Sequence, residues 1–225
     1  MNELIFVAHA IIVAGTALGA LVLGPSALVA FVCTCCVLAN LFVLKQITLF
    51  GFAATCADAF TIGATIGLNL LQEYFGASHA KRAIVINFFI LIFYAIVSQI
   101  HLIYIPSSSD EMHFHFMPLL NFMPRIIIAS LFVYYISQLA DYYFYGLLKR
   151  IFHHTHIIFR NYVSIALCQL LDTILFSFLG LYGIINNIGE IIIISYLIKL
   201  ISIFIAIPFV AFSRKIYNYV HNNHI

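Results

Sequence analysis

The chain has 225 residues, of which 64% are hydrophobic and only 8% are charged, and its formal net charge is +2. Its mean hydropathy is +1.09. A soluble domain of this size needs a far more charged surface, so the composition excludes one and indicates an integral membrane protein. The small net charge does not suggest nucleic-acid binding, and there is no room for a soluble catalytic domain.

Apolar runs of about 20 residues recur along the chain, which is the length that an α-helix needs to cross a bilayer. Barrel strands would instead alternate over about ten residues. The fold class is therefore all-α and polytopic, in a single transmembrane domain covering residues 1–225. The predicted spans are 4–23, 26–44, 59–75, 83–105, 126–148, 162–182 and 191–212.

The first two spans are separated by Gly24-Pro25, which predicts a tight turn because proline tends to end the preceding helix. No Lys or Arg precedes the first apolar run, so we expect a retained helix rather than a cleaved signal peptide. Cys33, Cys35 and Cys36 lie inside the second span, where we expect them to be small packing residues rather than metal ligands.

The third span is short and unusually polar. Its polar residues recur at steps of three or four positions, which keeps them on one face of a helix: Asp58, Thr65, Asn69 and Glu73, with Ile62 between them. An ionised carboxylate at membrane depth costs roughly 2.5–3.5 kcal/mol on insertion scales. We therefore expect this face to meet a partner or a water-filled cavity, in a helix buried among the others.

Similar stripes follow in three later spans. They comprise Ser130, Tyr134, Ser137, Gln138, Asp141 and Tyr145, then Ser164, Cys168, Gln169 and Asp172, then Ser195, Lys199 and Ser202. Serine alone indicates only helix–helix hydrogen bonds, which are typically worth about 0.6 kcal/mol. The ionisable groups favour a functional cavity, with a structural Asp–Lys pair as the alternative. Arg125, at the outer end of its span, either joins this site or snorkels to the interface.

The basic residues predict the orientation, because cytoplasmic loops are enriched in Lys and Arg. Most of them fall on one side of the seven-span arrangement: Lys81, Arg82, Lys149, Arg150, Arg160, Arg214 and Lys215. Asp110 and Glu111 lie on the other side, in the long loop 106–124, and Lys45 is the exception there. We therefore expect a cytoplasmic C-terminus.

Enzyme motifs are missing, since the chain contains no GxSxG, HExxH or Walker sequence. An intramembrane aspartyl pair, Asp141 with Asp172, is the one catalytic alternative. The histidines of the two loops, His113 and His115 in one and His153, His154 and His156 in the other, are expected to be solvated, because no fourth zinc ligand accompanies them. We expect no enzyme activity, no cofactor and no metal.

A cavity with carboxylates, amides and tyrosines suits a polar small molecule. A guanine-like edge offers two adjacent N–H donors that one carboxylate can accept, while Gln or Asn serves a carbonyl and aromatic rings stack. Sugars and amino acids would also find partners. The residues thus indicate a transporter or receptor for a polar small molecule.

The motifs in order are Asn40-LFVLK, Asn69-LLQ-Glu73-YFG followed by Lys81-Arg82, Arg125-IIIAS, then Gln138-LA-Asp141 and Asp172-Thr173, with Lys199 and Pro208 in the last span. Together they resemble the queuosine precursor transporter family, the YhhQ-like vitamin uptake transporters, over residues 35–212. The first acidic position of the family pattern is Asn69 here, so one carboxylate is replaced by an amide.

The resemblance implies six core helices within residues 26–212, so that the first span is an additional N-terminal helix. It implies import of 7-cyano-7-deazaguanine, its aminomethyl derivative or queuine across the inner membrane of a bacterium, for tRNA queuosine salvage by alternating access. The substrate-binding residues would be Asn40, Asn69, Glu73, Arg125, Gln138, Asp141, Gln169, Asp172 and Lys199. The partners would be the small-molecule substrate and the lipid bilayer, with homo-oligomerisation left open and no nucleic acid bound.

Two alternatives to a transporter that works alone remain open. One is a substrate-capture membrane subunit for another vitamin or nucleobase, which would need a separate ATP-driven partner. The other is a scaffold protein of the membrane, which would leave the ionisable residues of the spans unexplained.

Overall fold

The computed structural model describes residues 1–151 and 157–222, apart from some side chains of the last three long helices. The helices are α1 (Asn2–Leu23), α2 (Pro25–Phe42), α3 (Asp58–Phe75), α4 (Ala77–Ile103), α5 (His113–Leu120), α6 (Met123–Ile151), α7 (Ile157–Phe176) and α8 (Ile188–Asn222). A short π-helical segment, η1 (Ser177–Leu181), continues α7, and two strands, β1 (Gln46–Leu49) and β2 (Phe52–Thr55), join α2 to α3. Six of the predicted spans lie largely within one long helix each, and the span 162–182 covers most of α7 and all of η1.

Four described stretches are long and apolar enough to cross a membrane: Asn2–Leu23, Pro25–Phe42, Ala77–Ile103 and His113–Ser137. Large apolar side chains of α4 point outward, as lipid-facing residues do; Phe89, for example, is 72% exposed. The fold is thus mostly helical, as predicted, and it supports a polytopic membrane protein. The arrangement of six core spans plus one stays a prediction.

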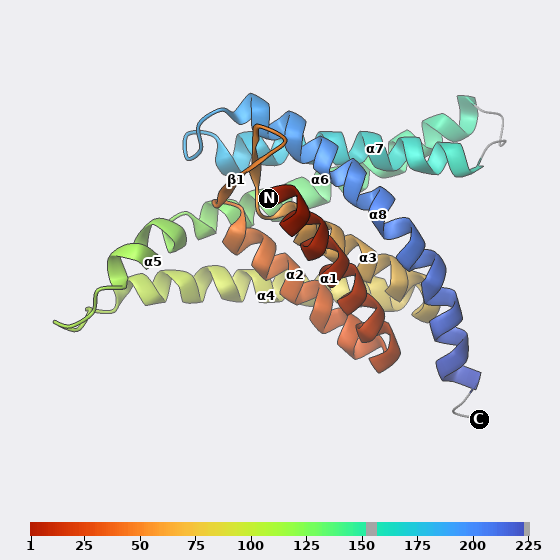
Figure 1. The fold of residues 1–225 in the computed structure, drawn as a ribbon, viewed down its shortest axis with the longest axis horizontal. Helices are drawn as coiled ribbons and strands as arrows, with labels where there is room; N and C mark the ends of the chain where they lie inside the picture. The colour runs from red at the N-terminus through yellow and green to blue at the C-terminus, as the bar shows by residue number, and fades with distance from the viewer. Residues whose placement is uncertain (152–156, 223–225) are drawn as a thin grey trace.

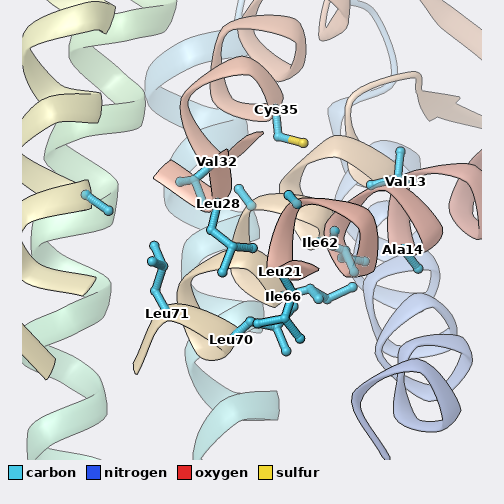
Figure 2. Packing of buried hydrophobic residues seen from close by; sticks show 14 of the residues in the cluster. Val13, Ala14, Leu21, Leu28, Val32, Cys35, Ile62, Ile66, Leu70 and Leu71 are labelled. Atoms are coloured by element: carbon cyan, nitrogen blue, oxygen red, sulfur yellow. The ribbon is translucent and has the colours of Figure 1, made fainter. Parts of the chain in front are cut away.

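The first three helices pack tightly against one another. Gly24, with a φ of 100°, ends α1, and Pro25 begins α2, so the predicted turn is confirmed. Buried apolar side chains of all three helices meet in one cluster, which includes Val13, Leu28 and Leu70 (Figure 2). The predicted additional N-terminal helix therefore packs against the rest of the molecule, with contacts to α2, α3 and α8.

A β-hairpin between α2 and α3 departs from the all-α prediction. Its strands are antiparallel, and Leu49 pairs with Phe52 across a two-residue turn. Phe50 and Gly51 both have positive φ, at 53° and 84°, which is the backbone of the primed turns that match strand twist. The hairpin lies beside the N-terminal end of α1 in Figure 1.

Helices α1 and α8 both contact this hairpin. The amide of Asn2 donates to the Thr48 carbonyl at 2.9 Å, and Glu3 Oε1 accepts from the Phe50 N–H at 3.0 Å. Leu49 of β1 is fully buried in a small cluster with Ile198 of α8. Contacts distant in the sequence, rather than strand propensity alone, thus stabilise these eight strand residues.

In the second half of the chain, α5 and α6 pack against α4. Helices α6 and α7 lie side by side, and α8 crosses them on its way to the C-terminus (Figure 1). The predicted long outer loop contains the helix α5. The polar composition of the first half of that loop did not indicate a helix. A second apolar cluster, including Leu91 of α4 and Met123 of α6, joins these elements.

Candidate functional site

A cavity of about 200 Å³ lies among the helices that follow α1. Its lining residues come from α2, α3, α4, α6, α7 with η1, and α8, together with the end of the hairpin. The helix α1 is described throughout and contributes none of them. Most of the wall is apolar, and a few polar groups converge on it. An apolar cavity with a few polar groups is the usual design of a small-molecule site.

An ion pair forms part of this wall. Lys199 of α8 donates to Asp172 Oδ2 of α7 at 2.7 Å and to the Thr173 hydroxyl at 3.1 Å. The Lys199 side chain is 7% exposed and that of Asp172 is 27% exposed, so the carboxylate is the more accessible partner. Burying a lysine this deeply is costly unless it is paired and hydrogen-bonded, as it is here.

Asp58 brings a second carboxylate to the same wall. It begins α3 and is 4% exposed. Its Oδ2 accepts a hydrogen bond from the Thr55 hydroxyl at 3.4 Å, and both Ser195 and Lys199 interact with the carboxylate. The first turn of a helix favours a negative charge, because its backbone N–H groups are unpaired there. Two carboxylates and one ammonium group therefore face this part of the cavity.

A group of uncharged polar residues lines the wall formed by α2 and α4. Asn40 donates its amide hydrogen to the Cys36 carbonyl at 2.7 Å. Asn87 of α4 interacts with the Cys36 thiol. The side-chain oxygen of Asn87 is buried and has no hydrogen-bond partner among the described residues. A buried acceptor without a partner requires an explanation, and a ligand in the cavity would supply one.

The predicted site residues do not all lie together. Asn40, Asp172 and Lys199 line the cavity. Asn69 and Glu73 lie on the C-terminal half of α3, are exposed, and are outside the described lining. The predicted stripe of α3 is therefore divided along the helix.

Two further predicted residues lie away from the described lining. Arg125 donates to the carbonyls of Leu179 at 2.9 Å and Tyr182 at 2.7 Å, where the segment after α7 ends. Gln169 is partly buried, and its backbone carbonyl accepts a hydrogen bond from the Thr173 hydroxyl at 2.7 Å.

Other predictions fall outside the description. Gln138 and Asp141 belong to α6, but their side chains are not among those described. His153, His154 and His156 lie outside the described residues, whereas His113 and His115 are in α5. Within the described part of the chain, no group of three or more His, Cys, Asp or Glu residues could hold a metal ion.

Sequence reasoning did not select two residues that the structure places at the cavity. Asp58 was part of the α3 stripe but was not chosen as a ligand. Asn87 had a clear signal, because it is the one amide in the apolar run from Ile84 to Phe93. A single polar residue in such a run indicates contact with another helix or with a cavity.

Comparison with known proteins agrees with these features. Residues 55–213 match the model of a protein family described as "Putative vitamin uptake transporter". A "Probable queuosine precursor transporter" of Bacillus subtilis (strain 168) is 33% identical over 183 residues, which cover 80% of each chain. No solved structure matches the chain.

Proposed function

Because the chain belongs to this family of vitamin uptake transporters, we propose that it imports a queuosine precursor of the 7-deazaguanine type. The family is one of transporters, so the protein is a multi-pass membrane transporter and not an enzyme. The observation that carries the substrate proposal is the similarity to the queuosine precursor transporter, together with a cavity whose polar groups suit a purine-like base.

Asp172 is the proposed contact for the guanine-like edge of the substrate. One of its oxygens accepts from Lys199, and about a quarter of its side chain is accessible. A carboxylate has enough lone pairs to bind Lys199 and still accept two adjacent N–H donors of a base. Lys199 would hold the carboxylate in position and balance its charge.

The apolar part of the cavity wall would contact the flat faces of the base. Phe176 and Tyr134 both line the cavity and offer aromatic surfaces. Asn40 of α2 and Asn87 of α4 would bind the remaining polar atoms of the ring. In this proposal the cavity opens to the two sides of the membrane in turn, while the substrate stays bound between the same helices.

An uptake experiment tests the function directly. The chain is expressed in cells that cannot synthesise 7-deazaguanines but can insert them into tRNA, and each precursor is supplied at low concentration. We expect queuosine in tRNA only when the chain is present. If no precursor restores queuosine while membrane insertion is verified, the protein either requires an ATP-driven partner or carries another substrate, and the proposal is wrong.

The variant Asp172→Asn links the function to the cavity. It removes a charged acceptor, and a hydrogen bond to a charged group contributes about 1.5–3 kcal/mol, so we expect uptake to fall by roughly tenfold or more. Glu190→Gln is the matched control, because Glu190 is an exposed carboxylate at the start of α8 and lies outside the described lining. Equal uptake by the two variants would contradict the role of Asp172.

A further inference from the structure

Among the described lining residues, the positive and negative charges are unequal in number. Lys199 is the ammonium group of the described lining, whereas Asp58 and Asp172 both contribute carboxylates. With all three ionised, two negative charges and one positive charge leave a net charge of −1. Lys199 is already bound to Asp172 at 2.7 Å and to the Thr173 hydroxyl, so its donors are largely used on α7.

Asp58 is the carboxylate that this arrangement leaves incompletely balanced. Its direct hydrogen-bond partner is the Thr55 hydroxyl, and Ser195 supplies a second hydroxyl. Hydroxyl groups donate hydrogen bonds but bring no positive charge. Lys199 acts on Asp58 through its charge, but its direct ion pair is with Asp172. A carboxylate that is 4% exposed in a membrane protein is stabilised far more by an opposite charge in direct contact than by hydroxyls and a more distant charge.

A second observation points to a ligand that reaches from this carboxylate to the wall of α4. The side-chain oxygen of Asn87 is buried there and has no partner among the described residues. It can accept an N–H of a ring, and Asp58 can accept the N–H groups of an amine. Both residues line the same cavity, Asp58 from α3 and Asn87 from α4.

We propose that Asp58 selects a ligand that carries a protonated amine on a flat heterocyclic base. This inference rests on the proposed function and refines it: among 7-deazaguanines, the aminomethyl compound is preferred over neutral analogues of similar size. The amine forms a charge-assisted hydrogen bond with Asp58, which restores charge balance in the cavity. Asp172 remains paired with Lys199 and contacts the ring.

The experiment compares initial uptake rates of three compounds that share one ring system. They are 7-aminomethyl-7-deazaguanine, which is a cation, and the neutral 7-hydroxymethyl and 7-cyano compounds. The hydroxymethyl compound nearly matches the aminomethyl compound in shape, so it isolates the effect of charge. We expect the wild-type chain to take up the cation about tenfold faster at limiting concentration, because the charged pair is lost with either neutral compound.

Asp58→Asn is the variant that tests the residue, and it preserves side-chain shape. We expect it to reduce the preference for the cation over the hydroxymethyl compound about tenfold, because only the cation brings a charge to pair. Glu190→Gln removes an exposed carboxylate of α8 and should keep the wild-type preference. Membrane insertion of each variant is verified by its amount in purified membranes.

The outcomes separate the two proposals. If the wild-type chain takes up all three compounds equally, the inference is overturned and the proposed function stands. If Asp58→Asn lowers uptake of all three equally, Asp58 acts only by supporting Lys199, and the inference is again wrong. The wild-type comparison decides the charge preference even if the variant fails to fold. Uptake of none of the compounds would overturn the proposed function itself.

Discussion

Lys199 shows how strongly the meaning of a single residue depends on its neighbours. A lysine within an apolar run indicates a partner but does not identify it. In the structure the partner is Asp172 of α7, and Asp58 of α3 also interacts with the ammonium group. The ion pair joins α7 to α8, and the charge of Lys199 also acts on the carboxylate of α3. The sequence left two interpretations open, a structural Asp–Lys pair and a functional cavity. In the structure the ion pair lines the cavity, so the two interpretations do not exclude each other.

At the same scale, Arg125 makes a testable structural contribution. Its guanidinium group bridges the carbonyls of Leu179 and Tyr182, where the π-helical segment ends. Lysine cannot bridge two acceptors with a planar fork. We expect Arg125→Lys to lower the free energy of unfolding by about 1–2 kcal/mol, as a lost hydrogen bond of a charged group at an accessible site does. Thermal unfolding in detergent measures the change.

The control for this prediction is Arg82→Lys. Arg82 is an exposed residue of α4 with no hydrogen bond or ion pair within the described part of the chain. The Arg82→Lys variant should unfold at the same temperature as the wild-type protein. If the Arg125 and Arg82 variants unfold together, the guanidinium bridge contributes nothing to stability.

At the scale of the elements, the close approach of α3 to its neighbours depends on two glycines. Gly63 and Gly67 are four residues apart, which is the small-residue spacing that lets membrane helices come together. A side chain at Gly67 would meet Val32 of α2 at 2.6 Å, and one at Gly63 would meet Val13 of α1. The surrounding apolar cluster is shown in Figure 2. Because Gly63 and Gly67 have no side chains, α3 can approach α1 and α2 this closely.

This packing predicts that Gly67→Ala destabilises the protein, although alanine favours helices. Overpacking a close interface typically costs about 1–3 kcal/mol. Gly19→Ala is the control, because nothing lies within 4 Å of the added methyl group in α1. Unfolding in detergent followed by circular dichroism should separate the two variants. Equal or higher stability of Gly67→Ala would show that α2 and α3 are not packed as described.

At the scale of the whole molecule, the membrane orientation is a prediction that the basic residues carry. Lys81, Arg214 and Lys215 are exposed in the structure, as expected for residues at a polar surface. We expect green fluorescent protein fused after residue 225 to fluoresce in a bacterial host, and alkaline phosphatase at the same position to be inactive, because the basic residues predict a cytoplasmic location for that end. Fusions placed in the loop at Ser108 should behave in the opposite way. Phosphatase activity at the C-terminal fusion would reverse the proposed orientation.

The sequence by itself determined the membrane class, the positions of the long helices and the turn at Gly24-Pro25. It also indicated Asp172 and Lys199 as residues of a polar site. These features depend on local hydropathy, on helix periodicity and on the cost of placing a charge in lipid, all of which are readable along one segment. The same reasoning named Asn40, which lines the cavity, and Glu73, which is exposed.

Only the tertiary structure decided which face of each helix meets the cavity. The α3 stripe was expected to continue from Asp58 to Glu73, but Ile62 packs into the apolar cluster with α1 and α2 instead. The burial of Asp58 and the unpartnered oxygen of Asn87 arise from helices that are distant in the sequence. The β-hairpin depends likewise on contacts with α1 and α8. Such contacts depend on how several helices pack together, and no single segment specifies that packing.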